Sequence, residues 1–288
     1  MQAAEIGVIG GSGLYQMEGL EGIEEVKVDT PFGDPSDNFI VGKLMGKRVA
    51  FLSRHRRGHA IQPSDINFRA NIYGMKKLGV SRIISVSAVG SMKDNIHPEE
   101  IVIPDQFYDN TKRRISTFFG DGIVAHVSLA DPVCSNLAGT LYQSAVKVGA
   151  KVHNGGVYIC IEGPQFSSRG ESYIYKSWGV DIIGMTNVTE AKLAREAELC
   201  YSTIALVTDY DCWHHEEEAV TTDAIIAILN KNVDTSKKII KEAVSRVSAD
   251  SGCGCRNALK DAIITSRDGI PSETRERLGL IIGKYISR

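Results

Sequence analysis

The chain has 288 residues, enough to bury a large hydrophobic core without disulfides or metals. It has 33 Lys and Arg against 35 Asp and Glu, and the net charge of −2 argues against broad electrostatic binding to nucleic acid or to an anionic membrane. No apolar run approaches the roughly 18 residues of a transmembrane helix, and residues 1–5 lack a charged signal-peptide region, so we expect a cytoplasmic protein.

Short β-branched runs alternate with longer helical patterns along the chain. Strands are predicted over residues 6–9, 25–28, 39–44, 48–53, 82–87, 101–103, 123–127, 157–161, 181–183 and 202–208. Helices are predicted over residues 64–78, 135–148, 171–178, 188–198, 223–248, 256–264 and 272–284. Ser64 is expected to cap the first of these helices and Gly79 to end it. The alternation predicts an α/β fold, a single domain over residues 1–288 with a central mixed β-sheet flanked by helices.

The first predicted strand runs into Gly10-Gly11-Ser12-Gly13, a loop whose backbone N–H groups can surround an anion. A dinucleotide-binding fingerprint would need glycine at Gln16, and a nucleophile elbow would need glycine at Leu14. A Walker loop is excluded because no Gly-Lys-Ser/Thr occurs. Two interpretations remain, a phosphate-sized anion site with the hydroxyl of Ser12, or a plain turn with a polar tip.

Two further predicted strands end in residues that favour an oxyanion. The strand 48–53 leads into Arg54-His55-Arg56-Arg57-Gly58-His59, whose cations suit a dianion such as phosphate, although a solvated basic turn has the same composition. The strand 82–87 leads into Ser87-Ala88-Val89-Gly90-Ser91, which adds hydroxyl and N–H groups. Because ligand loops gather at the carboxyl ends of strands in such sheets, the three loops together predict a phosphate site.

Later strands end in residues that suit a nucleobase or a sugar. Phe166 can stack on a flat base or belong to the core, and Met185 can pack on a sugar ring or fill a gap. Asp209 and Asp211 point the same way if extended, and close like charges raise one pKa, which suits a general acid. Metal ligation, helix capping and a dinucleotide edge remain alternatives for this pair. His214-His215-Glu216 lacks the His-Glu-x-x-His pattern, so no metal site is predicted there.

Together these motifs resemble the purine nucleoside phosphorylase superfamily, and its methylthioadenosine phosphorylase family most closely. The residues that carry the resemblance are Ile9-Gly10-Gly11-Ser12-Gly13-Leu14, Ser53-Arg54-His55, Ser87-Ala88-Val89-Gly90-Ser91, Ile161-Glu162-Gly163-Pro164-Gln165-Phe166-Ser167-Ser168-Arg169, Gly184-Met185-Thr186 and Thr208-Asp209-Tyr210-Asp211-Cys212-Trp213. They occur in the family's order over roughly the first 235 residues, and the remainder of the chain matches less well.

The resemblance implies the phosphorolysis of 5′-methylthioadenosine to adenine and 5-methylthioribose 1-phosphate, in purine and methionine salvage. Inorganic phosphate, a co-substrate, would be bound by Ser12, Arg54, His55, Ser87, the Ala88 amide and Thr186. Substrate would be bound by Met185 under the ribose, by Phe166 and Ser167 beside the purine, and by Asp209 and Asp211 at its N7 and 6-amino edge, with Asp209 as the catalytic acid. No metal and no organic cofactor is implied.

The resemblance also implies a homo-oligomer, a trimer or a hexamer built from two trimers. His126 corresponds to the residue that the family lends to a neighbouring subunit's site. Specificity is expected to depend on Asp209, Ser167 and Thr222. Asp209, with Ser167, favours adenine, because a 6-amino group needs an acceptor and relatives that use 6-oxopurines place Asn at this position. Thr222 stands where the closest relatives have an apolar side chain beside the methylthio group, so we predict that adenosine is also cleaved.

Other functions remain open at this point. A broad-specificity or 6-oxopurine nucleoside phosphorylase would share the fold and most of the motifs. A nucleoside hydrolase would use water in place of phosphate. A non-catalytic nucleotide-binding or oxidoreductase module would use the Gly10–Gly13 loop alone, and it would leave the Asp209 and Arg54 motifs without a role.

The six cysteines are Cys134, Cys160, Cys200, Cys212, Cys253 and Cys255. They contain no Cys-x-x-Cys pair, which argues against a zinc ribbon, and reduced thiols are the ordinary state in a cytosol. In some archaeal relatives, cysteines form disulfides and a Cys-x-Cys pair lies near the C-terminus. The resemblance therefore implies a disulfide between Cys134 and Cys200 and a redox-active pair of Cys253 and Cys255.

Overall fold

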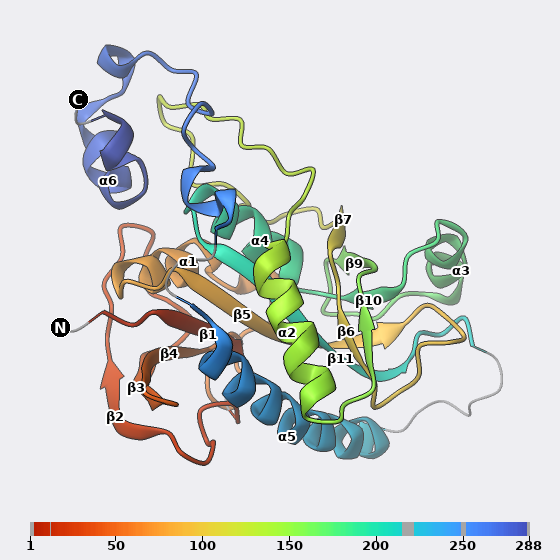
Figure 1. Cartoon of the computed structure of the whole chain (residues 1–288). Coiled ribbons are helices and arrows are strands. Elements are labelled where there is room, and N and C mark those ends of the chain that lie inside the picture. The colour runs from red at the N-terminus through yellow and green to blue at the C-terminus, as the bar shows by residue number, and fades with distance from the viewer. Residues whose placement is uncertain (1–2, 12, 215–221, 249–251, 287–288) are drawn as a thin grey trace.

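The computed structural model describes residues 3–11, 13–214, 222–248 and 252–286, without the side chains of residues 222–227 and 229 (Figure 1). Its strands are β1 (Ile6–Gly10), β2 (Glu21–Val26), β3 (Phe39–Leu44), β4 (Lys47–Ser53), β5 (Arg82–Ser91), β6 (Ile101–Ile103), β7 (Gln106–Asn110), β8 (Val152–Asn154), β9 (Val157–Ile161), β10 (Ile182–Gly184) and β11 (Cys200–Tyr210). Its helices are α1 (Phe68–Lys77), α2 (Ser135–Lys147), α3 (Arg169–Ser177), α4 (Asn187–Glu196), α5 (Thr222–Arg246) and α6 (Ser272–Ile286), with short 3₁₀ helices η1 (Pro63–Asp65), η2 (Gly254–Asn257) and η3 (Arg267–Gly269).

One mixed sheet contains all eleven strands of the described residues. The strand order is β2-β3-β4-β1-β5-β10-β9-β7, and β11, β6 and β8 continue from the other side of β5. The pairs of β1 with β4 and β5, and of β5 with β11, are parallel, whereas β10 runs antiparallel to β5. This confirms the predicted α/β class with a central mixed sheet flanked by helices.

Strand β5 changes its neighbour on one side halfway along its length. The pairing with β1 ends at Ile9 opposite Ser85, and the pairing with β10 begins only at Gly90. Between these points, residues 86–89 have no ladder partner on this side among the described strands, while β11 continues along the other side. Polar backbone groups must find partners when buried. This break in the sheet therefore leaves backbone groups of β5 available to side chains or to a ligand.

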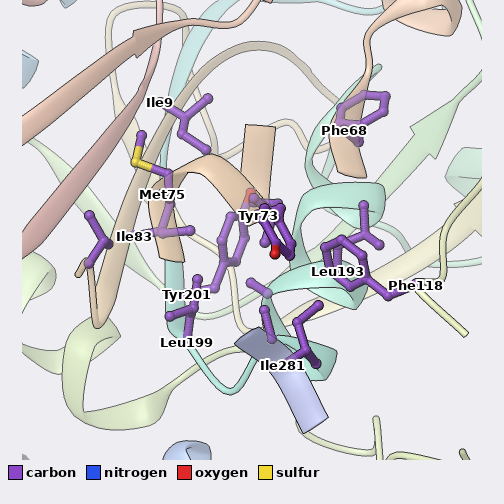
Figure 2. Close-up of a cluster of buried hydrophobic side chains, with 14 of the residues drawn as sticks. Ile9, Phe68, Tyr73, Met75, Ile83, Phe118, Leu193, Leu199, Tyr201 and Ile281 are labelled. Carbon is purple, nitrogen blue, oxygen red and sulfur yellow. The ribbon is translucent and has the colours of Figure 1, made fainter. Parts of the chain in front are cut away.

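Alternate residues of the central strands face two helical layers, as expected for a sheet buried on both faces. Val8 and Ile84 face the layer of α2 and α5. Ile9 and Ile83 face the layer of α1 and α4, and Ile281 of α6 joins the same core (Figure 2). In Figure 1, α6 and α3 lie at opposite ends of the view, with the sheet between them.

Most predicted elements are confirmed with small changes in their boundaries. The prediction that Ser64 caps the helix 64–78 is wrong. The helix α1 begins at Phe68, and its cap is Asn67, whose side chain accepts from the Ala70 N–H. Ser64 lies in η1 and donates instead to the carboxylate of Glu162. Gly79 follows the helix at a φ of +89°, a value that suits glycine.

Two predicted elements are wrong. Residues 123–127 form no strand, because only isolated bridges occur there, such as Ala125 with Ile263. Residues 256–264 form no α-helix, because η2 gives way to turns. Strands β7 and β8 were not predicted, because neither has the apolar alternation that marks a half-buried strand. No helix among the described residues is long and apolar enough to cross a membrane.

Candidate active site

A cavity of about 370 Å³ opens at the break in β5. It is lined by ten of the residues predicted from the sequence, namely Arg54, His55, Ser87, Ala88, Phe166, Ser167, Met185, Thr186, Asp209 and Asp211. These residues come from the end of β4, from β5, from the loops after β9 and β10, and from the end of β11. The topology thus brings strand ends that are far apart in sequence to one cavity, and its size suits a small organic ligand.

Three predicted residues are not among those that line the cavity. Ser12 lies outside the described residues, and so does the side chain of Thr222 at the start of α5. His126 is described and exposed, and its backbone N–H donates to the Ala262 carbonyl. The roles predicted for these three residues stay predictions.

Arg54 is buried, with 3% of its surface exposed, and it forms an ion pair with Glu190 of α4. Its Nε lies 2.5 Å from Oε1 of Glu190, and its Nη2 lies 3.2 Å from Oε2. Nη2 also donates to the hydroxyl of Ser85 at 2.6 Å, and Nη1 donates to the carbonyl of Val86 at 2.9 Å. Burial lowers the pKa of Arg54 and the carboxylate of Glu190 raises it, with a net increase. The interpretation of Arg54 as part of a solvated turn is therefore wrong.

A guanidinium has five N–H groups. The contacts of Arg54 with Glu190, Ser85 and Val86 occupy Nε–H, both Nη2 hydrogens and one Nη1 hydrogen. None of these hydrogen bonds uses the second Nη1 hydrogen, and Arg54 lines the cavity. Arg54 thus presents at least one donor to a ligand, while its main charge partner is a protein carboxylate.

The basic run after β4 divides between the cavity and the surface. Arg57 donates to Glu25 and Asp37 on the surface, and Nε of Arg56 donates to the Ser36 carbonyl. His59, the last residue of this run, does line the cavity. Composition alone could not predict which of these side chains line the cavity and which lie on the surface. That depends on the backbone of the turn, in which Arg56 takes a φ of +63°.

His55 lies in the cavity wall beside Arg54. Its Nδ1 lies 2.8 Å from the Ile61 carbonyl, and its ring stacks on that of His59 with 4.4 Å between the ring centroids. Burial and the neighbouring charge of Arg54 lower the pKa of His55 to about 4. The ring is therefore neutral at neutral pH. Since a carbonyl oxygen can only accept, we assign the proton to Nδ1, and this leaves Nε2 as an acceptor.

One part of the cavity lining carries two buried side-chain oxygens without partners. Oδ2 of Asp211 and Oγ of Ser167 have no hydrogen-bond partner among the described residues. Burial raises the pKa of Asp211 above its ordinary value. The nearby Asp209 accepts at Oδ1 from the Thr208 hydroxyl at 2.5 Å. A buried polar atom without a partner lowers the stability of the fold by about 1–3 kcal/mol. This part of the cavity is therefore suited to a polar ligand that supplies the missing partners.

Arg114 and Glu162 connect the loops after β9 and β10, and this role was not predicted from the sequence. Arg114 donates through Nη2 to the Glu162 carbonyl at 2.7 Å and through Nη1 to the Met185 carbonyl. Burial alone would raise the pKa of Glu162, but hydrogen bonds from the Lys112 N–H and the Ser64 hydroxyl lower it to about 2. Arg114 therefore ties the loop after β9 to the loop after β10.

Met185 lies close to the backbone of the loop after β9. A Cβ at Gly163, which has a φ of +67°, would lie 2.6 Å from Sδ of Met185, so glycine is needed there. Phe166 is 80% exposed and lines the cavity from the outside. Leu14, Leu206 and Val233 add apolar lining. The sequence does not mark these three residues as site residues, because each also has the appearance of an ordinary core residue.

Comparison with known proteins agrees with this geometry. The protein-family model described as "Phosphorylase superfamily" matches residues 5–245. The S-methyl-5′-thioadenosine phosphorylase of Geobacter sulfurreducens is 60% identical over 282 residues, which cover 98% of this chain and 99% of that protein. The chain therefore belongs to the phosphorylase superfamily and, within it, to the family of the methylthioadenosine phosphorylases.

Solved structures agree with this membership. A methylthioadenosine phosphorylase sourced from an Antarctic soil metagenomic library matches with a TM-score of 0.94 and 49% identity, covering 98% of this chain and 99% of that one. The methylthioadenosine phosphorylase of Schistosoma mansoni in complex with adenine matches with a TM-score of 0.82 and 36% identity, covering 89% of this chain and 96% of that one. The shared fold thus extends over nearly the whole chain.

We predict that His55 makes the protein less stable between pH 6.5 and pH 4. The pKa of His55 is about 4 in the folded protein and about 6.5 in an unfolded chain, so the unfolded chain binds more protons in this interval. The free energy of unfolding therefore falls as the pH drops through it, by about 3 kcal/mol for the full shift. Urea unfolding at pH 7 and pH 4.5 should show a smaller loss in His55→Gln than in the wild type. Equal losses would contradict the buried neutral imidazole.

Proposed function

We propose that this chain is a cytoplasmic enzyme that cleaves 5′-methylthioadenosine with inorganic phosphate, giving adenine and 5-methylthioribose 1-phosphate. One observation supports this most strongly. A single cavity has Arg54, His55 and Thr186 in its lining together with the buried, unpartnered oxygens of Ser167 and Asp211. The first group suits an oxyanion, and the second suits the polar edge of a purine. Membership in the methylthioadenosine phosphorylase family supports the same assignment.

Phosphate would bind where β5 lacks a neighbour. The N–H of Ala88 and the remaining N–H of Arg54 would donate to its oxygens. The hydroxyls of Ser87 and Thr186 donate to the Ala88 carbonyl and to Oδ1 of Asn187 in this structure, and they would turn from these acceptors to donate to phosphate. The neutral ring of His55 would accept the O–H of a hydrogenphosphate at Nε2. Because Glu190 offsets the charge of Arg54, the bound phosphate keeps most of its negative charge. That charge both stabilises positive charge on the sugar and leaves an oxygen nucleophilic.

Phosphorolysis passes through an oxocarbenium-like state, as glycoside hydrolysis does. The C1′–N9 bond breaks with its electron pair on the purine, and a phosphate oxygen forms the new bond to C1′. Asp209 would donate a proton to N7 of the leaving purine. The proton that adenine gains is balanced by the one that hydrogenphosphate loses. The proposed reaction uses phosphate as a co-substrate and uses no metal or organic cofactor.

The base preference follows from acceptors and donors. A 6-amino group donates, and a carboxylate such as that of Asp211 or Asp209 accepts. A 6-oxo group would leave two acceptors facing each other, which costs about 1–3 kcal/mol. The apolar lining from Leu14, Leu206 and Val233 suits a methylthio group. We also propose that adenosine is cleaved, because a hydroxyl at Thr222 would tolerate a 5′-hydroxyl.

We predict that the protein releases adenine from methylthioadenosine only when phosphate is present. Asp209→Asn keeps the shape of the side chain and removes the acid, so turnover should fall by about 10²–10⁴-fold. Asp261→Asn, at an exposed position of the C-terminal segment, is the matched control and should keep full turnover. Chromatographic separation of adenine and hypoxanthine after incubation with each nucleoside gives the measurement.

Three outcomes would reject parts of this proposal. Equal release of adenine without phosphate would indicate a hydrolase. Faster release of hypoxanthine from its nucleoside would indicate a 6-oxopurine phosphorylase. Unchanged turnover in Asp209→Asn would mean that another group protonates the purine.

We further propose that the chain forms a trimer, or a hexamer of two trimers, in which His126 reaches a neighbouring cavity. The exposed position of His126 supports this, because the residue does not line the cavity of its own chain. Val124 and Ile264 beside it are 50% and 66% exposed, and the Ile264 N–H donates to the Val124 carbonyl. Exposed apolar side chains that adjoin in this way are typical of an interface.

Native mass spectrometry tests the oligomer. We predict a multiple of three chains for the wild type and smaller species for Val124→Glu, because a buried charge at an interface is costly. Val146→Glu in α2, where the valine is 54% exposed, is the matched control and should keep the wild-type mass. In His126→Ala the oligomer should persist and the KM for the nucleoside should rise. A fully active monomer would contradict the proposal.

A further inference from the structure

Four cysteines from separate parts of the chain meet at the end of the sheet remote from the cavity. They are Cys134 at the N-cap of α2, Cys200 at the start of β11, and Cys253 and Cys255 at the start of η2, and we call them the four-cysteine cluster. Their four Sγ atoms all lie within 4.8 Å of one another. Cys200 and Asp209 are nine residues apart on β11, so the cluster lies about 30 Å from the proposed catalytic acid.

The spacing of the four sulfurs is compatible with ligation of a single metal ion. A tetrahedral zinc ion with Zn–S bonds of about 2.3 Å places its sulfur ligands about 3.8 Å apart. The Sγ atoms of Cys200 and Cys253 are 3.3 Å apart, whereas bonded sulfurs lie about 2.05 Å apart. The structure describes all six cysteines, and four of them belong to the cluster. Three members of the cluster are buried and Cys253 is half-buried, so the site is closed in the way of a structural metal site.

We propose that the four-cysteine cluster binds one Zn²⁺ ion through four thiolates. Binding replaces four S–H bonds by four S–Zn bonds and releases the thiol protons, with no change of oxidation state. Four soft thiolates in tetrahedral arrangement select zinc over magnesium, calcium or manganese. A zinc ribbon needs Cys-x-x-Cys pairs, which the sequence lacks, but four ligands drawn from three separate segments of the chain need no such pair.

The surroundings suit a site with a net negative charge. A zinc ion with four thiolates carries two negative charges in excess. Cys134 lies at the positive end of the thirteen-residue helix α2, which favours a thiolate. Arg82 and Arg246 line a hollow that Cys134 and Cys200 also line, although Arg246 also pairs with Glu242. Positive groups therefore lie close to the place where the excess charge would be.

The proposed ion would fasten the C-terminal segment to the body of the protein. Cys253 and Cys255 begin the segment that follows α5 and ends in α6, while Cys134 and Cys200 belong to the packed core. Since binding to the folded state alone stabilises it, removal of the ion should lower the melting temperature. The disulfide between Cys134 and Cys200 that the family resemblance suggests uses the same sulfurs and is the competing state.

The test uses the full chain, purified with a reductant and without chelator. Elemental analysis by mass spectrometry should find one zinc per chain. After the zinc is removed under reducing conditions, added Co²⁺ should give the visible bands and sulfur-to-metal charge-transfer bands of a tetrahedral thiolate site. Cys255→Ser should lower the affinity for Co²⁺ about tenfold or more. Cys212→Ser, a cysteine outside the cluster, is the matched control and should bind Co²⁺ as the wild type does.

Two results would overturn the proposal. One is a reduced wild-type protein that contains no zinc and shows no thiolate bands with Co²⁺. The other is a Cys134–Cys200 disulfide, found by peptide mapping of freshly isolated protein that was never exposed to oxidant. If Cys255→Ser does not fold, the Co²⁺ titration of the wild type still decides between the two states.

Discussion

The buried ion pair between Arg54 and Glu190 determines how the cavity is built. Removing two charges from water costs several kcal/mol for each ion, and only close pairing with further hydrogen bonds compensates for that cost. Both conditions are met here, since Oε2 of Glu190 also accepts from the hydroxyls of Ser85 and Tyr201 at 2.8 Å. The pair joins the end of β4 to α4. Arg54 also donates to the Val86 carbonyl, which has no partner strand at the break in β5.

This arrangement separates the two chemical tasks of the cavity. The ion pair provides a donor for an oxyanion without concentrating positive charge, so a bound phosphate can remain a nucleophile. In the function proposed here, the buried oxygens of Ser167 and Asp211 would face the polar edge of the purine. Arg114 holds the loop after β9 against the loop after β10, because it donates to the carbonyls of both Glu162 and Met185. The family membership and the geometry therefore both support one cavity that binds phosphate and a nucleoside together, as proposed above.

Much of this could be predicted from the sequence, because the relevant signals are local. A run of β-branched residues followed by Arg54 and His55, or by Asp209, identifies a polar strand end wherever the strand lies in the sheet. The α/β class follows from the same alternation. Several of the ten lining residues carry such a local signal, whereas Ser167 and Thr186 were predicted through the family resemblance.

The remainder depends on contacts between distant segments. Glu190 looks like any acidic residue of a helix, and only the fold shows that it meets Arg54 across 136 residues of sequence. The four-cysteine cluster likewise forms only through the fold, since its members are separated by up to 121 residues of sequence. Strand β7 carries no apolar alternation, so only its pairing with β9 defines it. Such features require the topology, which local patterns do not contain.

The kinetics and stability of Glu190→Gln test the account most directly, with Glu276→Gln on the exposed side of α6 as the control. If Glu190 fixes Arg54, its loss leaves a buried charge without its partner. The variant should unfold with a free energy lower by about 3 kcal/mol, and its KM for phosphate should rise about tenfold while its KM for the nucleoside changes little. A folded Glu190→Gln enzyme with the wild-type KM for phosphate would contradict the account.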